Sequence, residues 1–290
     1  MPEDRSALGA FLRSRRDRLT PGQAGIAAFP GPRRVPGLRR EELAVLAGLS
    51  PDYYSRVEQG RQANVSVEVL DVLARALRLD ETERRHLHDL AAPGRARKAT
   101  VAEAAQRPDP GLLRLMVALD HVPVLLLGVR SEVLAANELL RAVLGHDMEP
   151  GTSFGRWLLT DPAARERILN WEVFARNTVA GLRREAGRRP HDRKLTAAIR
   201  EILRADPEIA RWWEDHLVRD HASVTKEIRH PVAGDLTFGV EAVGPPYAAD
   251  QILVVYTVEP GSSTARMLPL LASWAGRSTM DGPDRSAMNR

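Results

Sequence analysis

The fold of the N-terminal third of the chain is decided by the stretch Pro36-Gly-Leu-Arg-Arg-Glu-Glu-Leu-Ala-Val-Leu-Ala-Gly-Leu-Ser-Pro-Asp-Tyr-Tyr-Ser-Arg-Val-Glu-Gln-Gly60. A helix is predicted from about Arg39 to Leu46, and it ends at Gly48, which can take the left-handed conformation of a tight C-terminal turn. Ser50 then caps a second helix, with Pro51 at its first position, where a missing N–H costs nothing. The stretch therefore predicts two short helices joined by a tight turn.

The crossing of these two helices is predicted from the small residue at their contact. Ala44 lets the helix axes approach closely, and a turn of three residues that contains Gly fixes a steep crossing. The side chains expected to be buried are Leu43, Ala44 and Leu46 on the first helix and Leu49, Tyr54 and Val57 on the second. This arrangement is the geometry of a helix-turn-helix.

The same stretch carries a family resemblance. The chain resembles the XRE/lambda-repressor-like helix-turn-helix family in Leu43-Ala44, Ala47–Ser50, Tyr54–Gly60 and the helix Ser66–Leu77. The resemblance covers roughly residues 6–91 and implies an all-α domain of five helices, the last from Glu81 to Ala91. More narrowly, residues 34–44 and 52–61 resemble the MmyB-like regulators, a bacterial subgroup. The resemblance implies that double-stranded DNA is the partner of this domain.

The second helix of the pair is the expected recognition helix. If it starts at Ser50, its exposed N-terminal residues reach base edges or phosphates in the major groove. These candidates are Ser50, Asp52, Tyr53, Ser55 and Arg56. The phosphate candidates are Arg33 and Arg34 in the preceding loop, Arg39 and Arg40 at the start of the first helix, and Arg61 just past the second. For any single Arg, a solvated surface position is the alternative.

The start of the recognition helix has an unusual composition. Tyr54 falls on the buried stripe, whereas Tyr53 is expected to face DNA. Asp52 repels phosphate unless it accepts from a cytosine amine or orients an Arg. Pro51 stands where the family often has a polar residue that reads bases, so base specificity is expected to depend on the later exposed residues of the helix.

Positive charge is concentrated in the same third of the chain. The net charge of +4 divides into 18 basic and 13 acidic residues in 1–100, and 24 basic and 25 acidic residues in 101–290. Residues 6–19 predict a basic amphipathic helix, with Leu8, Phe11, Leu12 and Leu19 near one stripe and Arg13, Arg15, Arg16 and Arg18 mostly around the rest. A positive end joined to a neutral end favours nucleic-acid binding, and nonspecific binding by an Arg-rich end is the simplest alternative.

A small, polar, Pro-bearing segment divides the chain. It spans residues 92–110 and predicts a linker between a domain at 1–91 and a second domain at 111–262, followed by a C-terminal helix and disordered tail at 263–290. The second domain is predicted to be α+β, with helices on one side of an antiparallel sheet and a loop after residue 144. The predicted helices are 111–119, 138–144, 161–187, 192–204 and 207–218, and the predicted strands are 123–129, 133–137, 222–230, 235–243 and 251–258.

The order of elements in the second domain is similar to a PAS-like sensor, which the MmyB-like resemblance also implies. The matching features are Pro123, Asn137, Trp171, the Trp213-x-x-His216 pair, the His230-Pro231-x-x-Gly234 turn and Glu259-Pro260. Known members are associated with fatty-acid-like ligands, so the resemblance implies an apolar pocket between sheet and helices. The ligand-binding candidates are Asn137, Trp171, Trp213 and His216. For Asn137 the alternative is a helix cap, and for Trp213 and His216 it is packing of their helix on the sheet.

Other function classes find little support in the sequence. The chain has no cysteines, which excludes disulfides, zinc fingers, iron–sulfur clusters and thiol catalysis and favours a cytoplasmic protein. Neither a secretory signal nor an apolar run long enough for a membrane span is found. His216 and His221 do not share a helix face. The helix that carries His86 and His88 is predicted to lie at the surface, and neither His pair has ligand spacing with Asp or Glu, so no metal site is expected. No Gly-rich phosphate loop, nucleophile elbow or carboxylate pair in a fitting context is found, so no cofactor or catalytic residue is expected.

The sequence thus predicts a sequence-specific bacterial transcription regulator rather than an enzyme. A homodimer is expected, because one recognition helix reads only a few base pairs. The C-terminal domain is expected to sense a small, fatty-acid-like molecule. The alternatives are that this domain recruits a protein partner or is an enzyme.

Overall fold

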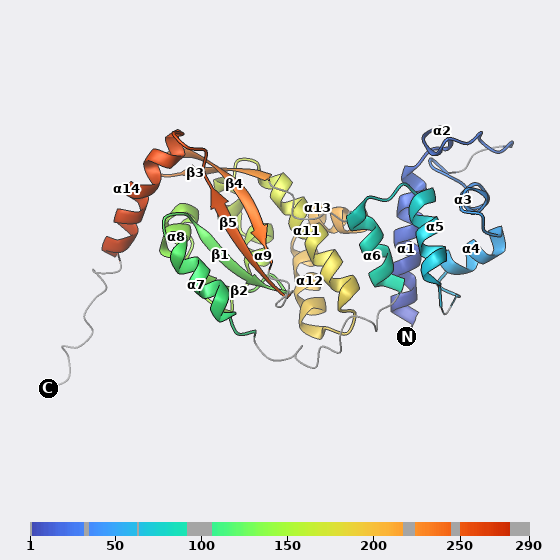
Figure 1. The fold of residues 1–290 in the computed structure, drawn as a ribbon, viewed down its shortest axis with the longest axis horizontal. Helices are drawn as coiled ribbons and strands as arrows, with labels where there is room; N and C mark the ends of the chain where they lie inside the picture. Colours follow the sequence, from blue (N-terminus) through green and yellow to red (C-terminus); the bar gives the residue numbers. More distant parts are fainter. Residues whose placement is uncertain are drawn as a thin grey trace. The chain divides into compact units, whose positions relative to one another are not determined.

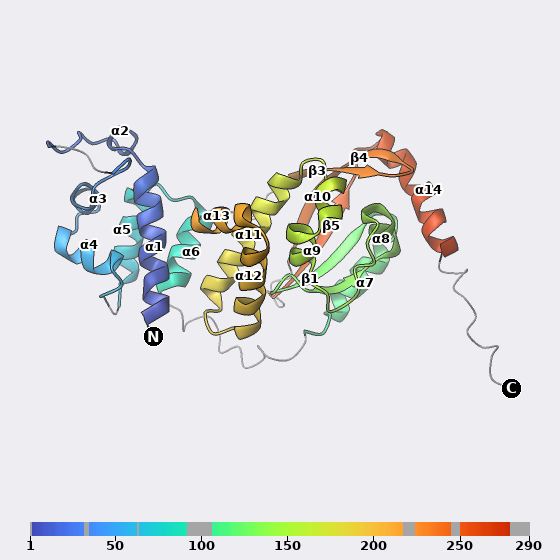
Figure 2. The same ribbon diagram turned by 180° about the vertical axis from the view of Figure 1, so that it is seen from behind.

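The computed structural model describes residues 2–31, 35–62, 64–91, 106–216, 224–244 and 250–278. Contacts divide the chain into two compact units, Met1–Glu103 with Val179–Asp220, and Ala104–Thr178 with His221–Arg290. Figure 1 shows the elements of both units, and Figure 2 shows them from behind. Most of the predicted linker and the predicted C-terminal tail lie outside the described residues.

The N-terminal unit is built from helices. They are α1 (Pro2–Arg18), α2 (Pro21–Ala24), α3 (Arg40–Leu46), α4 (Pro51–Glu58), α5 (Val67–Ala76), α6 (Glu81–Ala91), α11 (Trp171–Arg188) from Val179 onward, α12 (Arg193–Ala205) and α13 (Pro207–Glu214). The predicted all-α helix-turn-helix domain is confirmed. One difference is that the loop predicted after α1 contains the single turn α2, which Thr20 caps.

The helix pair α3–α4 forms for local reasons. Arg39 is the N-cap of α3, and the buried carboxylate of Glu42 accepts the Arg39 backbone N–H at 2.7 Å. The turn after α3 passes through Gly48, whose φ of 67° is the left-handed conformation expected there. Ser50 caps α4 by accepting a backbone N–H of its first turn, and Pro51 is the first helical residue. The predicted helix-turn-helix motif is therefore confirmed, and the start of its first helix differs from the prediction by one residue.

One apolar core joins α1 to the helix pair and to α5 and α6. Its most deeply buried side chains are Phe11, Leu12, Leu38, Leu43, Ala44, Tyr54, Val57, Leu73 and Leu87. Arg15 and Arg16 of α1, expected outside the apolar stripe, are also buried. His86 was expected on a surface helix, but it is only 2% exposed because the face of α6 that carries it contacts α1, where its ring meets the edge of Phe11.

The C-terminal unit contains a five-stranded antiparallel sheet in the order β2-β1-β5-β4-β3. The strands are β1 (Val124–Gly128), β2 (Val133–Ala136), β3 (Val224–His230), β4 (Gly234–Val243) and β5 (Gln251–Thr257). The helices are α7 (Pro110–Ala118), α8 (Glu138–Leu144), α9 (Phe154–Thr160), α10 (Pro162–Arg167), the first residues of α11, and α14 (Ser263–Ser278). The predicted α+β class with an antiparallel sheet is confirmed.

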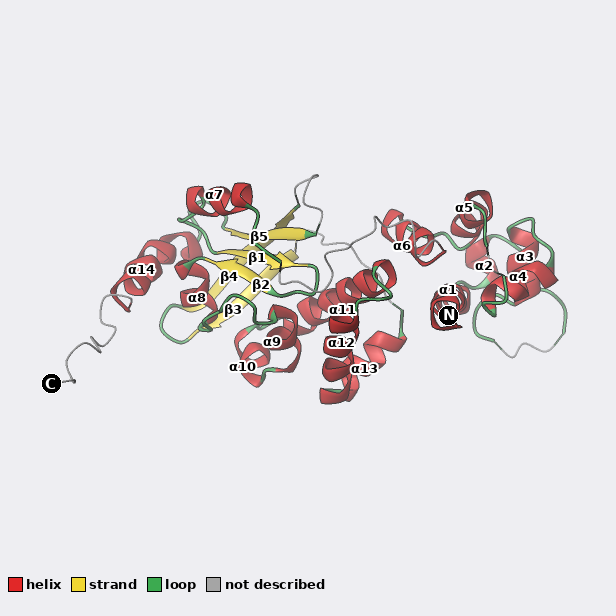
Figure 3. Ribbon diagram, turned by 90° about the horizontal axis from the view of Figure 1, so that it is seen from below, coloured by secondary structure: helices red, strands yellow, loops and turns green. Residues whose placement is uncertain are grey.

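Helices cover both faces of this sheet, which corrects the expectation that they gather on one side. α7 packs Leu112 and Met116 against one face of β1 and β5, and Figure 3 shows α9 and α10 on the other side. The physical reason lies in β1, where the consecutive residues Val124, Leu125 and Leu126 are all buried. Successive strand residues point to opposite faces, so an unbroken apolar run needs cover on both.

The long helix predicted over residues 161–187 is two helices, α10 and α11, and the preceding predicted loop contains α9. The chain leaves the helical conformation at Ile168, which forms an isolated bridge with Ile228 of β3. Asn170 donates to one backbone carbonyl of β3 at 2.8 Å and accepts a backbone N–H of β3 at 3.1 Å. This break depends on a strand distant in sequence, which helical periodicity does not reveal.

The closest approach between α1 and α4 is at Gly9. A Cβ on Gly9 would overlap the backbone carbonyl oxygen of Glu58, which cannot move without moving α4. Gly22 of α2 is different, since a Cβ there would meet nothing within 4 Å among the described residues. Gly9 therefore permits the distance at which α1 packs against α4.

We expect Gly9→Ala to lower the free energy of unfolding by about 2 kcal/mol, because the overlap outweighs the gain of about 1 kcal/mol in helix propensity. The matched variant Gly22→Ala should keep or slightly raise stability. Urea and thermal unfolding followed by circular dichroism measure both variants. Equal stability of the two variants would show that α1 can shift away from α4 without loss.

Candidate functional site

The exposed face of α4 carries the predicted base-reading residues. Asp52 and Arg56 form an ion pair at 2.8 Å, with 78% and 48% of their side chains exposed. The guanidinium of Arg56 lies 6.0 Å from the centre of the Tyr53 ring. Tyr53 is half-buried and packs against the core, so only part of its ring faces solvent. The carboxylate of Asp52 thus orients the guanidinium of Arg56.

The remaining predicted DNA contacts have different surroundings. The hydroxyl of Ser50 is occupied as the cap of α4, and Ser55 accepts from Gln59 at 3.0 Å. Arg61 is exposed just after α4. Arg33 and Arg34 lie outside the described residues.

Arg39 and Arg40 both turn part of their side chains toward the protein. Arg39 donates to the carbonyls of Pro30 and Gly31 at 3.0 and 2.9 Å, which ties down the loop before α3. Arg40 donates through Nε to Glu58 at 2.9 Å. Both Arg residues also line an open hollow of about 530 Å³, together with Arg13, Arg16, Asp17, Val35 and Glu41. Four Arg and two acidic residues line this hollow, so it is a basic concave surface beside α3.

A buried carboxylate that the sequence reasoning missed lies beneath this surface. The side chain of Glu58 is 0% exposed. Its two oxygens accept from Nε and Nη2 of Arg16 at 3.0 and 3.3 Å, and it also accepts from Tyr54 Oη at 2.7 Å and from Arg40 Nε. The spacing of Tyr54 and Glu58, four residues apart on one helix, was the available signal.

The pKa of Glu58 reports the balance of these contacts. Burial raises the pKa of the carboxyl, but the hydrogen bonds and charge of Arg16, with the hydrogen bonds of Tyr54 and Arg40, outweigh burial and hold the pKa below its usual value. Glu58 is therefore an anion at neutral pH.

Glu58→Gln is expected to lower the free energy of unfolding by about 3 kcal/mol at pH 7, because Arg16 stays buried without its charged partner. A carboxylate with a lowered folded-state pKa contributes stability above its unfolded pKa of about 4.3, and this contribution is lost as pH falls through the folded pKa. Wild type should therefore lose stability more steeply than the variant below about pH 5.

Urea unfolding between neutral and acid pH measures this difference. Glu172→Gln is the matched control, because Glu172 forms an exposed ion pair with Arg176; removing such a pair should change stability by about 0.5 kcal/mol or less. Parallel acid profiles of wild type and Glu58→Gln would contradict the role given to Glu58.

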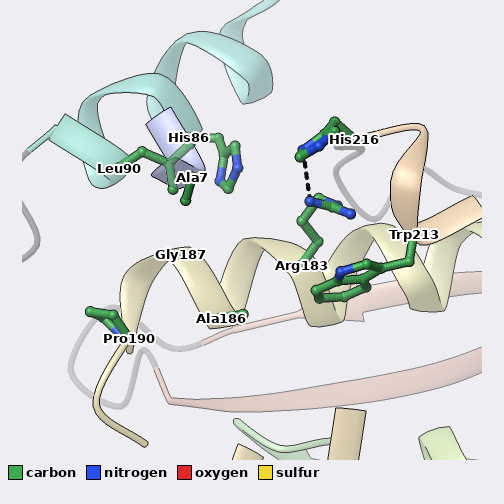
Figure 4. A pocket seen from close by; sticks show the side chains of 9 residues that line it. All are labelled: Ala7, His86, Leu90, Arg183, Ala186, Gly187, Pro190, Trp213 and His216. Atoms are coloured by element: carbon green, nitrogen blue, oxygen red, sulfur yellow. Dashed lines mark hydrogen bonds between the residues drawn. The ribbon is translucent and has the colours of Figure 1, made fainter. Parts of the chain in front are cut away.

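Two of the predicted ligand residues, Trp213 and His216, meet at Arg183. The Arg183 guanidinium lies 4.2 Å from the centre of the Trp213 ring, and Nη1 donates to Nδ1 of His216 at 2.8 Å. They line a pocket of about 130 Å³, shown in Figure 4, with Ala7, His86, Leu90, Ala186, Gly187 and Pro190. Burial and then the charge of Arg183 lower the pKa of His86 to about 3 and that of His216 to about 4, so both rings are neutral at pH 7.

The other two predicted ligand residues, Asn137 and Trp171, belong to the C-terminal unit. Asn137 is the N-cap of α8, and its amide also hydrogen-bonds Val122 and Val124 at 2.7 and 3.0 Å. The indole of Trp171 donates to the carbonyl of Leu158 at 2.7 Å. Both polar groups are thus used by the fold itself.

Lys226 of β3 is a buried cation that the sequence reasoning also missed. It is 2% exposed and donates to Tyr256 Oη at 2.9 Å. Its Nζ lies 4.2 Å from the centre of the Phe174 ring and 5.6 Å from that of Phe154. No ion pair joins it to a carboxylate in the described part of the chain. Burial lowers the pKa of Lys226 to about 7.

Lys226→Met should raise the free energy of unfolding at pH 6 by about 2 kcal/mol, because it removes a buried charge and keeps the length of the side chain. Between pH 7 and the unfolded lysine pKa of about 10.4, the unfolded chain binds more protons than the folded chain, so wild-type stability rises with pH and the advantage of the variant shrinks. Urea unfolding at several pH values measures this, with the exposed Lys194→Met as control. A gain that does not depend on pH would contradict the argument.

The described residues contain no group of three or more His, Cys, Asp or Glu placed to hold a metal ion. A search of the same residues finds no helix that is both long and apolar enough to cross a bilayer.

Comparison with known families finds two matches along the chain. Residues 7–87 match a helix-turn-helix domain, and residues 108–271, more than half of the chain, match the MmyB-like transcription regulator ligand binding domain. No curated protein matches the chain. Both matched families are regulatory rather than enzymatic. The chain therefore belongs to the MmyB-like transcription regulators and joins a DNA-binding helix-turn-helix domain to a ligand-sensing domain.

Proposed function

We propose that this protein is a sequence-specific bacterial repressor or activator that acts in the cytoplasm as a homodimer and responds to a small, fatty-acid-like ligand. The domains proposed are 1–91 for DNA binding, 92–110 as linker, 111–262 for ligand binding and 263–290 as C-terminal helix and tail. The helix-turn-helix match supports the DNA-binding domain, and the ligand-binding match supports the ligand-binding domain.

The observation that carries the DNA-binding proposal is the Asp52–Arg56 pair on the exposed face of α4. A guanidinium held by a neighbouring carboxylate loses less side-chain freedom when it binds a base edge. Arg56 is therefore proposed to read a base, with Tyr53, Ser55 and Asp52 beside it in the major groove.

The phosphate contacts are proposed for the basic residues around α3 and α4. They are Arg33, Arg34, Arg39, Arg40 and Arg61, with Ser50 at the start of α4. The hollow that Arg39 and Arg40 line offers a concave basic surface to a phosphate chain. A second copy of the chain is proposed because a single recognition helix reads too few base pairs for a specific site.

The ligand is proposed to contact Asn137, Trp171, Trp213 and His216. Trp213 and His216 line a pocket, but at about 130 Å³ it is too small for a long acyl chain, and Asn137 and Trp171 spend their polar groups on the fold. The support for these four residues is therefore the family resemblance. A C-terminal domain that recruits a protein partner or is an enzyme remains the alternative function. The match of residues 108–271 to a ligand-binding family favours the sensor.

We expect Arg56→Ala to weaken binding to the operator about tenfold or more, because one base-reading Arg contributes about 1–3 kcal/mol. Arg266→Ala is the matched control, an exposed Arg on α14 whose loss should leave affinity within about twofold. Fluorescence anisotropy with DNA from upstream of the protein's own gene and with random DNA, across salt concentrations, measures both.

Two results would contradict the proposal. Equal losses in Arg56→Ala and Arg266→Ala would remove Arg56 from the interface. Loss of all discrimination over random DNA at physiological salt would leave only the electrostatic, nonspecific term.

A further inference from the structure

The pocket around Arg183, which we call the Arg183 pocket, lies within the N-terminal unit (Figure 4). Ala7 and the pair His86 and Leu90 contribute to it from α1 and α6, and Arg183 and Trp213 come from α11 and α13. Helices of the DNA-binding match and two helices of the ligand-binding match, α11 and α13, thus line one pocket.

Arg183 has hydrogen-bonding capacity that the protein does not use. Nη1 donates to His216, but the Nε and Nη2 atoms are buried and have no hydrogen-bond partner among the described residues. Burial, and then the charge of Arg15, lower the pKa of Arg183 only to about 10, so it remains a cation at pH 7. Burying N–H groups of a cation without acceptors costs folding free energy, so an acceptor beyond the described side chains is expected at this edge of Arg183.

The two free nitrogens lie on the same edge of the guanidinium, which is the edge that fits a carboxylate at two points. Arg16 provides the precedent within this protein. Its Nε and Nη2 hold both oxygens of Glu58 at 3.0 and 3.3 Å. Arg183 presents the same edge, but no carboxylate is among the described residues that line its pocket.

A second unsatisfied group lines the same pocket. Nδ1 of His86 is buried and has no hydrogen-bond partner among the described residues. His216 is held in the left-handed conformation with a φ of 50°, uncommon for a residue other than glycine. That conformation is kept by two arginines, since Arg15 donates to the His216 carbonyl at 2.5 Å and Arg183 to its ring. Polar groups therefore converge on the pocket from α6 and from the end of α13.

Among the side chains that the structure describes, the acids near the pocket pair with other arginines than Arg183. Arg15 pairs with Glu83 at 3.2 Å, and Asp215, whose side chain is 57% exposed, lies beside Arg18 at 4.0 Å. Asp89 lies 3.9 Å from Arg188 on the other side. The nearby acids are thus taken up by other arginines.

The size and lining of the pocket limit what fits. Its volume is about 130 Å³, and an apolar cavity of about 150 Å³ is known to hold benzene. Apart from Arg183 and the two histidines, the lining is Ala7, Leu90, Ala186, Gly187, Pro190 and the ring of Trp213. The cavity suits a body of about one aromatic ring, and a long acyl chain is too large for it.

We propose that the Arg183 pocket binds a compact organic carboxylate. Nε and Nη2 of Arg183 hold its two oxygens, the His86 ring lies within reach of the same group, and the apolar lining surrounds its body. Because the ligand touches α1 and α6 as well as α11 and α13, its binding stabilises the packing of these helices by mass action. An effect of the ligand on DNA binding rests on the proposed function, whereas ligand binding itself needs no DNA.

Isothermal titration calorimetry on the full chain tests the proposal with four probes. Benzoate carries the charge and the ring, benzyl alcohol the ring alone, inorganic phosphate the charge alone, and decanoate a long chain. We expect saturable binding of benzoate, at least about tenfold tighter than that of benzyl alcohol, since a bidentate charged hydrogen bond is lost in the alcohol. Phosphate and decanoate should bind more weakly than benzoate.

Variants locate the binding. Arg183→Gln should weaken benzoate binding about tenfold or more, and Arg176→Gln, at a half-buried Arg of the same helix that does not line the pocket, should leave it unchanged. Ala186→Leu keeps Arg183 and fills the cavity, so it should abolish binding even if Arg183→Gln folds poorly.

The other results overturn the proposal. Equal affinity for benzoate and benzyl alcohol would show that Arg183 does not recognise the charge. If phosphate binds most tightly of the four probes, the site is one for an inorganic anion. If decanoate binds most tightly and its affinity is unaffected by Ala186→Leu, the ligand binds elsewhere. Operator affinity is measured separately with and without benzoate, so a failure of specific DNA binding and a failure of this pocket are told apart.

Discussion

The carboxylate of Glu58, closed off from water, is the constraint on which the DNA-binding unit depends. An ion in that position is tolerated only if nearly all its lone pairs are satisfied, and partners come from two other helices, Arg16 of α1 and Arg40 of α3. Arg16 also donates to the carbonyl of Leu38 at 2.6 Å, so the loop before α3 is held by the same side chain. One buried charge therefore fixes the positions of α1, the loop and the helix pair, and Gly9 provides the close approach that this requires.

The same constraint separates the two faces of α4. Its buried face is anchored in the protein through Tyr54 and Glu58, while its exposed face presents Asp52 and Arg56 to solvent. A helix held on one face by a network of hydrogen bonds keeps its exposed side chains in a defined place, which specific contact with a base edge needs. Rigidity and recognition thus come from opposite faces of an eight-residue helix.

The parts of this fold that sequence predicts are those with local causes. The helix pair follows from a cap, a proline and a glycine at Ser50, Pro51 and Gly48, and the structure places all three as expected. Arg16 and His86 were assigned to the solvent because periodicity places Arg and His on polar faces. Their partners lie far away in sequence, 42 residues in the case of Arg16 and Glu58, so no local pattern reports their burial. The same limit hid the break that Asn170 makes between α10 and α11.

Arg16, Lys226 and Arg183 show three ways in which a positive charge removed from water is accommodated. Arg16 has an internal carboxylate that meets its two-nitrogen edge, and the result is a fixed joint. Lys226 has no carboxylate among the described residues, but its single ammonium group is served by the Tyr256 hydroxyl and by aromatic faces. The guanidinium of Arg183 lies over the Trp213 ring, and its Nε and Nη2 atoms have no acceptor among the residues that the structure describes, although they line a pocket. An aromatic face does not accept hydrogen bonds from the edge of a planar guanidinium, so of these three cations Arg183 is the one for which a bound ligand is proposed.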